Sequence, residues 1–261
     1  MNIPDNIKRF IGNKSFEVDT VGMSDSKVIC FHDMVLKIEN QCEESEKESK
    51  MMQWLADKLP VPKVICSEKL NNKNYLLMSK VRGSMSCGSE FLRKPELLVK
   101  VLVEGLKMLW AVDISDCPCD SSIDNKLKFA QERVLSNLCS MDNVEQDTYG
   151  ENGFSSPQEL LKWLKDNKPN ESYVLSHGDY CLPNIFIDNN KISGFIDLGR
   201  CGIGDKYQDI ALCYRSLVHN FEGRYGGEVY EGFNADILFH ELGIEPNWDK
   251  IRYYILLDEL F

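Results

Sequence analysis

The fold is decided by the stretch His177-Gly178-Asp179-Tyr180-Cys181-Leu182-Pro183-Asn184-Ile185-Phe186 and by Gly194-Phe195-Ile196-Asp197-Leu198-Gly199, which follows it. Asp179 and Asn184 lie five residues apart on one predicted loop, and Asp197 follows a predicted hairpin. Phosphoryl transfer from a nucleotide requires a carboxylate near the attacking hydroxyl and oxygen ligands that hold Mg²⁺ against the phosphates. We therefore expect these three polar side chains to meet at one cleft.

A structural interpretation of the same residues is also open. Asp179 and Asn184 could be turn formers and Asp197 a helix cap, because Asp and Asn are common in both roles. Two linked motifs in this order, each on a predicted strand-loop-strand, favour the catalytic interpretation.

The composition is that of an acidic chain with room for a sizeable core. With 261 residues, 43% of them hydrophobic, we expect one compact unit with two lobes. The 41 acidic residues against 30 Lys and Arg give a net charge of -11, which argues against a nucleic-acid or anionic-membrane partner and favours cations. Alternatively, the acidity only keeps the protein soluble.

Cysteine usage and hydropathy indicate a cytoplasmic protein. Ten Cys residues without a secretory leader predict free thiols in a reducing compartment. Cys117 and Cys119 have no second Cys/His pair at metal spacing, so no zinc site is expected. No apolar run approaches the roughly 20 residues needed to cross a bilayer, so no membrane partner is expected.

Residues 1–80 are expected to form the small lobe, an antiparallel sheet with one main helix. The β-rich runs are broken at Gly22 and at His32-Asp33, and the helical pattern stops before Pro60. The predicted strands are Phe16–Val21, Lys27–Phe31, Val35–Ile38, Val64–Cys66 and Tyr75–Ser79, and the predicted helix is Glu43–Leu59.

Residues 81–261 are expected to form a larger, mostly helical lobe around a short β-rich block. The predicted helices are Pro95–Val112, Ile123–Leu138, Pro157–Asn167, Tyr207–Phe221, Val229–Leu242 and Trp248–Leu257. The predicted strands are Tyr173–Leu175, Ile185–Ile187 and Ile192–Ile196.

The two motifs resemble the catalytic loop (H-G-D-x-x-x-x-N) and the metal-binding element (I-D-x-G) of the aminoglycoside phosphotransferase and choline kinase group, relatives of protein kinases. The resemblance implies a two-lobed, protein-kinase-like α+β fold that binds ATP and Mg²⁺. It also implies that Asp179 is the catalytic base or positions the hydroxyl, and that Asn184 and Asp197 bind magnesium.

A kinase of this kind also needs a strand lysine for the α and β phosphates and a helix glutamate to hold that lysine. Lys37 stands in the predicted strand Val35–Ile38, and Glu48 resembles the glutamate of the family's helix. Glu43, Glu44 and Glu46 are rivals for this role, and most charges on such a helix are solvated.

Two further segments are expected to contact the nucleotide. Ser24 lies in the loop Val21–Ser26, which would cover the phosphates two strands before Lys37, although such a loop is often a plain hairpin turn. Tyr75–Gly83 resembles the family's hinge, so backbone groups near Met78, Ser79 and Val81 would read the adenine edge. The same segment is equally consistent with a core strand, in which Met78 only packs.

The last nine residues, Tyr253–Phe261, resemble the C-terminus of aminoglycoside 3'-phosphotransferases. By this resemblance Asp258, Glu259 and the terminal carboxylate of Phe261 bind ammonium groups of the antibiotic. Aminoglycosides carry several ammonium groups, and clustered carboxylates can replace the water around them.

A second acidic segment and two basic side chains complete the predicted site. Asp142 and Glu145 match acidic ligand positions of the family's substrate loop, although a solvated acidic loop is an equal alternative. Arg200 matches an arginine near the phosphate and substrate, or it pairs with Asp205 or Asp209. Asp209 and Arg215 also match family positions, and by the resemblance they would brace the catalytic loop.

The resemblance leaves the nucleotide and the substrate open at two points. Val35 stands where family members have an aromatic residue that stacks on adenine, so GTP is an alternative to ATP. The catalytic motifs are shared with kinases for choline, homoserine, methylthioribose and macrolides, and a catalytically silent nucleotide-binding domain is a further alternative. The C-terminal Leu-Leu-Asp-Glu-Leu-Phe run favours phosphorylation of the 3'-hydroxyl of an aminoglycoside, which would confer resistance.

Overall fold

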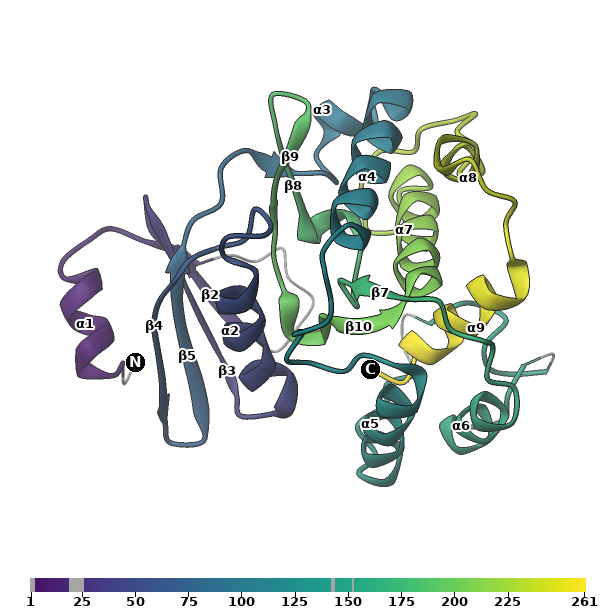
Figure 1. Cartoon of the computed structure of the whole chain (residues 1–261), viewed down its shortest axis with the longest axis horizontal. Helices are drawn as coiled ribbons and strands as arrows, with labels where there is room; N and C mark the ends of the chain where they lie inside the picture. The colour runs from purple at the N-terminus through teal and green to yellow at the C-terminus, as the bar shows by residue number, and fades with distance from the viewer. Residues whose placement is uncertain (1–2, 19–25, 142–143, 152) are drawn as a thin grey trace.

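The computed structural model describes residues 3–18, 26–141, 144–151 and 153–261. It has a small lobe built on an antiparallel sheet and a larger lobe dominated by helices (Figure 1). This arrangement confirms the predicted two-lobed α+β fold. Two residues predicted for the site, Ser24 and Asp142, lie outside the described residues.

The small lobe contains a five-stranded sheet with the order β1-β2-β3-β5-β4. Its strands are β1 (Glu17–Val18), β2 (Lys27–Cys30), β3 (Met34–Asn40), β4 (Val64–Leu70) and β5 (Lys73–Ser79). Alternate residues of β3 are buried because one face of the strand packs on a core, while the residues between them are partly exposed. In this register Lys37 lies opposite Leu76 of β5, and Val35 opposite Met78.

Helix α1 (Asp5–Ile11), which the sequence reasoning missed, and helix α2 (Glu43–Leu55) accompany this sheet (Figure 1). Ile7 of α1 is fully buried in a core it shares with Leu36 and Leu77. Helix α2 begins with reciprocal hydrogen bonds between Cys42 and Ser45, a capping box that satisfies two backbone N–H groups. It ends at Leu55, earlier than the predicted Leu59.

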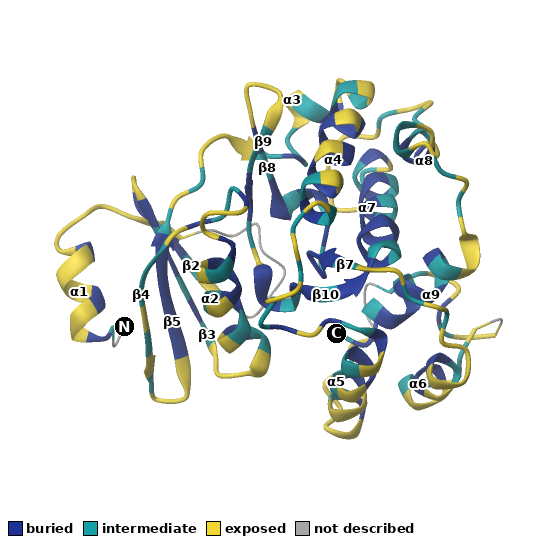
Figure 2. Cartoon of the chain, in the orientation of Figure 1, coloured by how far each residue is buried: buried dark blue, intermediate teal, exposed yellow. Residues whose placement is uncertain are grey.

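The larger lobe encloses the main hydrophobic core, and Figure 2 shows its buried residues along α4 and α7. Its helices are α3 (Ser89–Leu92), α4 (Pro95–Trp110), α5 (Ile123–Leu135), α6 (Pro157–Asp166), α7 (Lys206–Phe221), α8 (Ile237–Leu242) and α9 (Trp248–Asp258). The predicted helix Val229–Leu242 is wrong in its first half, where the chain forms turns and irregular structure. Gly232 there has a φ of 80°, and Phe233 stacks on Phe221 of α7 with a centroid distance of 3.6 Å, so tertiary packing replaces the helix.

Two small sheets carry the catalytic motifs. One sheet contains β6 (Ser84–Met85), β8 (Ile185–Asp188) and β9 (Lys191–Phe195). In the other, β7 (Tyr173–Ser176) pairs with β10 (Gly202–Asp205). The 3-10 helices η1 (Leu182–Asn184) and η2 (Leu198–Arg200) flank them. The short strands β6 and β10 had not been predicted. Within the described ranges, no helix is both long and apolar enough to span a membrane.

Candidate active site

The first motif folds into the loop between β7 and β8, and its carboxylate and carboxamide are in direct contact. The Nδ2 atom of Asn184 donates hydrogen bonds to Oδ2 of Asp179 at 2.9 Å and to its carbonyl oxygen at 3.0 Å. Residues 182–184 form η1, whose single turn brings the two side chains together. Burial raises the pKa of Asp179, which favours its acting as a proton acceptor above its usual acidic range.

Asp209 of α7 fixes the start of this loop through hydrogen bonds. Its carboxylate accepts hydrogen bonds from Oγ of Ser176 at 3.0 Å, from the backbone N–H of His177 at 2.9 Å and from that of Gly178 at 3.0 Å. Asp209 is fully buried, and a buried carboxylate is tolerated when donors surround it. Its neighbour Gln208 donates from Nε2 to the carbonyl of Gly178 at 2.8 Å, a contact that the sequence did not indicate.

Gly178 lets this loop lie directly on η2. Its φ is 85°, and a Cβ at this position would lie 2.1 Å from the carbonyl oxygen of Arg200. Only glycine meets both conditions without strain. The two motifs are also joined by a hydrogen bond from the N–H of Ile196 to the carbonyl of Asn184 at 3.0 Å.

Lys37 projects from β3 into a group of carboxylates. Its Nζ lies 2.8 Å from Glu48 of α2, 2.9 Å from Asp197 and 3.6 Å from Glu39. Burial opposes the charge of the lysine, yet these carboxylates raise its pKa well above the usual value. Burial also raises the pKa of Glu48 to about 7, even though the Lys37 ammonium acts in the opposite direction. The rivals Glu43 and Glu46 pair instead with other lysines, Lys47 and Lys69.

Asp197 precedes η2 in a left-handed backbone conformation, with φ 58° and ψ 57°. Non-glycine residues adopt this region rarely, and such strain is often found at functional sites. Partial desolvation works against its charge, but Lys37 lowers the pKa of Asp197 below the usual range. Its ionised carboxylate and the amide of Asn184 are oxygen ligands of the type that Mg²⁺ prefers.

Arg200 follows Asp197 within η2 and connects three parts of the chain. Its Nε lies 3.2 Å from Glu44 of α2, and its Nη1 lies 3.0 Å from Asp258 at the end of α9. The alternative pairings with Asp205 and Asp209 are wrong. Asp205 instead pairs with Lys250, and its carboxylate also accepts a hydrogen bond from Tyr254.

Asp258, the first of the C-terminal acids, is bound to two arginines in this structure, of which Arg200 is one. Asp258 also pairs with Arg215 of α7, and although burial opposes its charge, Arg215 and Arg200 lower its pKa. Phe261 places its ring 4.9 Å from the guanidinium carbon of Arg200. Buried Lys126 of α5 lies 5.8 Å from the same ring, and burial lowers its pKa to about 8; this residue was not anticipated.

Glu259 and Glu145 connect the C-terminus to the acidic segment. One oxygen of Glu259 accepts the backbone N–H of Glu145 at 2.9 Å, and burial raises the pKa of Glu259 to about 7. Glu145 itself lies 2.9 Å from His219 and 3.2 Å from Arg224. The hydrogen bond with His219 lowers the pKa of Glu145 to about 2. Neither basic partner had been singled out from the sequence.

The predicted hinge, Tyr75–Gly83, overlaps β5, which ends at Ser79, and the N–H groups of Ser79 and Lys80 already donate to other parts of the small lobe. The N–H of Ser79 donates to the carbonyl of Lys63 at 2.9 Å, and Oγ of Ser79 accepts from the N–H of Lys63 at 2.8 Å. Val81 packs closely on Gly194 of β9, where an added Cβ would lie 2.3 Å from its Cγ1. The N–H of Ser79 therefore fixes the strand end rather than facing a ligand.

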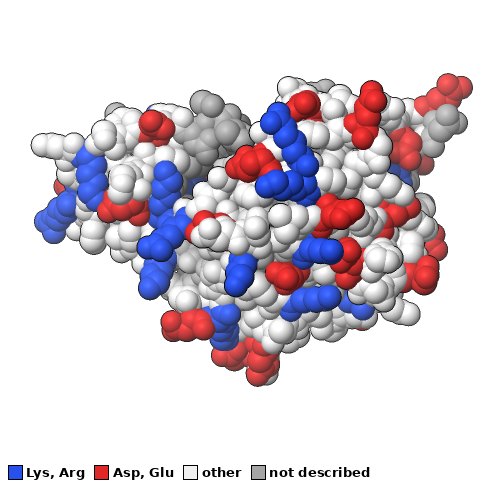
Figure 3. Space-filling model, turned by 90° about the horizontal axis from the view of Figure 1, so that it is seen from above, with Lys and Arg blue, Asp and Glu red and all other residues white. Residues whose placement is uncertain are grey.

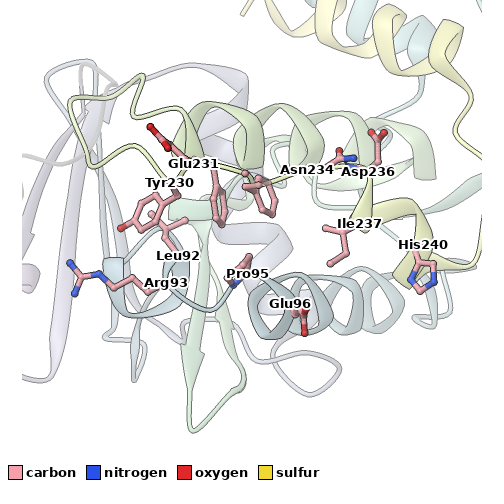
Figure 4. Close-up of a pocket in the computed structure, with 13 residues that line it drawn as sticks. Leu92, Arg93, Pro95, Glu96, Tyr230, Glu231, Asn234, Asp236, Ile237 and His240 are labelled. Atoms are coloured by element: carbon pink, nitrogen blue, oxygen red, sulfur yellow. Dashed lines mark hydrogen bonds between the residues drawn. The ribbon is translucent and has the colours of Figure 1, made fainter.

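Two hollows of the surface differ in their relation to these residues. A small one at the junction of α2, η2 and the C-terminus is lined in part by Glu44, Lys126, Arg200 and Phe261. A larger one lies between the start of α4 and the segment before α8 (Figure 4). Its lining contains none of the residues predicted for catalysis or binding.

The charged side chains on the face shown in Figure 3 are mixed, and neither sign forms one continuous patch there. A nucleic-acid-binding face is typically a basic patch or stripe. The viewed face therefore offers no such surface.

The chain matches known proteins over its whole length. The model of the phosphotransferase enzyme family matches residues 13–254. Two curated relatives named aminoglycoside 3'-phosphotransferase come from Enterococcus faecalis and Staphylococcus aureus, and they are 39% and 38% identical. Each alignment covers 100% of this chain and 99% of the relative.

Solved structures share the fold. The aminoglycoside phosphotransferase APH(3'')-Id of Streptomyces rimosus superimposes with a TM-score of 0.81 at 23% identity, covering 97% of this chain and 95% of that one. A second structure of that enzyme contains ADP and streptomycin. An aminoglycoside-3'-phosphotransferase of type VIII gives a TM-score of 0.73 at 22% identity, covering 98% of both chains.

Proposed function

Because the chain belongs to the phosphotransferase enzyme family, we propose that it transfers the γ-phosphoryl group of ATP to the 3'-hydroxyl of aminoglycoside antibiotics. The observation that carries the proposal is the contact of Asp179 with Asn184, on a loop that lies against the Arg200–Asp258 pair. The residue proposed to accept the proton of the hydroxyl thus lies next to the proposed site for cationic groups. The added phosphate would remove a hydroxyl that the drug needs, which gives resistance in the cytoplasm.

The residues around the cleft take distinct roles in this reaction. Asp179 accepts the proton of the attacking hydroxyl or orients it, and Asn184 fixes the direction of its carboxylate through the 2.9 Å hydrogen bond. Lys37 binds the α and β phosphates, and Glu48 holds the lysine in place. Asn184 and Asp197 would hold Mg²⁺, which neutralises charge on the phosphates when it is bound.

The nucleotide would lie between the sheet of the small lobe and the hinge. Val35 and Met78 are opposite each other on β3 and β5, and both supply apolar contact for a purine. Backbone groups of the hinge near Met78, Ser79 and Val81 would read its edge, and Ser24 would cover the phosphates. ATP is the expected donor, and GTP is the alternative because aliphatic contact discriminates purines weakly.

The antibiotic would bind where acids of the larger lobe meet the C-terminus. Asp258, Glu259, the carboxylate of Phe261, Glu145 and Asp142 would bind its ammonium groups, and Arg200 would contact the transferred phosphoryl group. Charged ligands are held strongly when such groups are already oriented by neighbours, as the arginines orient Asp258.

A coupled nucleotide-consumption assay tests this function. Kanamycin, neomycin, an analogue lacking both the 3' and 5'' hydroxyls, choline, homoserine, methylthioribose and a macrolide are compared with ATP and with GTP. Turnover of kanamycin but not of the deoxy analogue supports the proposal. If only another alcohol is turned over, the proposed catalytic residues stand and the proposed substrate is wrong. Absence of turnover with every substrate, while nucleotide binds, would favour a silent nucleotide-binding domain.

A further inference from the structure

Two glutamates of helix α2 each form an ion pair with a basic side chain of the proposed active site. Glu44 and Glu48 are four residues apart, so they lie on the same face of the helix, one turn from each other. Glu48 binds Lys37 at 2.8 Å, and Glu44 binds Arg200 at 3.2 Å. The helix therefore touches both a phosphate-binding lysine and the arginine next to the C-terminal acids.

The backbone between these two contacts is closely packed. A Cβ at Gly199, which is buried, would lie 2.9 Å from the carbonyl oxygen of Glu44, so η2 lies directly on the first turn of α2. Asp197, at the start of η2, pairs with Lys37 at 2.9 Å. Arg200 is thus held against α2 directly, through Glu44, and Asp197 is connected to α2 through Lys37, which also pairs with Glu48.

The guanidinium of Arg200 is fixed at two points. Glu44 contacts Nε from the small lobe, whereas Asp258 contacts Nη1 from the larger lobe. A planar guanidinium held through two of its nitrogens has one defined orientation. Its Nη2 atom, which neither contact uses, still has N–H groups to offer a substrate.

We propose that Glu44 is a positioning residue for the phosphoryl transfer, which acts by orienting Arg200 toward the antibiotic and the transferred phosphoryl group. This inference rests on the proposed function. Glu44 gives α2 a contact with the substrate site that is separate from the Glu48–Lys37 contact with the nucleotide. Placement of α2 by the bound nucleotide would therefore also place Arg200.

The ion pair with Arg200 contributes little to the stability of the fold. The side chain of Glu44 is 44% exposed, and solvent screens such pairs. Asp258 and the ring of Phe261 keep Arg200 in contact with the larger lobe when Glu44 is replaced. Loss of the Glu44 carboxylate should change the direction of the guanidinium and leave the protein folded.

The test compares Glu44→Gln with Glu46→Gln. Both substitutions remove one carboxylate from the first turn of α2, but Glu46 is bound to Lys69 within the small lobe. For Glu44→Gln we expect kcat/KM for kanamycin to fall about tenfold, because misplaced groups lower catalysis without loss of fold. The Kd of an ATP analogue without antibiotic should stay within about twofold, since the Lys37–Glu48 pair is intact. Glu46→Gln should match the wild type in both measurements.

A double-mutant cycle then separates positioning from a general structural effect. In an Arg200→Lys background, Glu44→Gln should change kcat/KM by less than about twofold, because the group it orients is gone. An equal tenfold loss in that background, or equal behaviour of the Glu44 and Glu46 variants, overturns the proposal. Wild-type enzyme without activity on any aminoglycoside refutes the proposed function itself, and is thereby distinguished from a failure of Glu44 alone.

Discussion

The side-chain amide of Asn184 donates a 2.9 Å hydrogen bond to the carboxylate of Asp179, which fixes the direction of the proposed proton acceptor. We predict that Asp179→Asn lowers kcat by about 10³-fold, a typical loss when a general base is removed. The Kd of an ATP analogue should stay within about threefold, because the Lys37–Glu48 pair, which is the proposed phosphate site, is left intact.

Steady-state kinetics and nucleotide titration check this prediction on the same preparations. Asp188→Asn is the matched control, because Asp188 is an exposed carboxylate at the end of β8. It should retain wild-type kcat. Equal activity of the Asp179→Asn variant and the wild type would contradict the assignment of the base.

Much of the fold could be predicted because its elements carry strong local patterns. The strands that flank the catalytic loop have apolar runs bounded by polar turns, and α2 and α4 have clear helical periodicity. Helix α1 and strands β6 and β10 are short, and the latter form only by pairing with distant segments. The segment 229–236 was predicted as helix, but its stacking on Phe221 cannot be read from local sequence.

The candidate site was predictable in its residue types and less so in its contacts. Glu48 was identified by its resemblance to the family's helix glutamate, with Glu43, Glu44 and Glu46 as rivals, and the structure places it 2.8 Å from Lys37. One partner of Arg200, in contrast, is Glu44, which is 156 residues away in the sequence. The spacing of charges along the chain does not specify such a contact, because it depends on how the two lobes meet.

Gly178 provides a prediction about the packing of the catalytic loop. We expect Gly178→Ala to lower the free energy of unfolding by more than about 2 kcal/mol and to abolish measurable turnover. The added Cβ would meet the carbonyl oxygen of Arg200 at 2.1 Å, in addition to the strain of a φ of 85°. Chemical denaturation and steady-state kinetics measure the two effects.

Gly226→Ala separates the two causes. Gly226 has a φ of 80°, but nothing lies within 4 Å of the added Cβ. Its substitution should cost only about 1 kcal/mol, from backbone strain alone. Equal losses for the two variants would show that close packing of the loop against η2 is not what requires Gly178.

Asp258 is held by Arg200 and Arg215, so its removal should affect stability as well as substrate binding. We predict that Asp258→Asn lowers the free energy of unfolding by about 3 kcal/mol, since it leaves two largely buried guanidinium groups without their shared carboxylate. The Kd for kanamycin should rise. Urea denaturation and calorimetric titration measure these effects, with Asp166→Asn at the exposed end of α6 as a control. Stability unchanged from the wild type would contradict the assigned role of this ion pair.

Glu259 gives a prediction for the dependence of stability on pH. Burial raises the pKa of Glu259 from 4.5 to about 7, so the folded protein binds its proton more tightly than the unfolded chain. The resulting stabilisation is fully present below pH 4.5 and is lost as the pH rises through about 7. Between pH 5 and 8 the wild type should therefore lose about 2 kcal/mol more unfolding free energy than Glu259→Gln, which has no proton to release.

Urea denaturation at several pH values measures the difference between these two proteins. Glu231→Gln, an exposed glutamate outside the site, should follow the wild-type pH dependence. If Glu259→Gln and the wild type lose stability in parallel, Glu259 titrates normally and is charged at neutral pH. If the curves diverge as predicted, Glu259 is partly protonated at pH 7. An ammonium group of the antibiotic would then lower its pKa on binding, so binding near pH 7 would release a fraction of a proton.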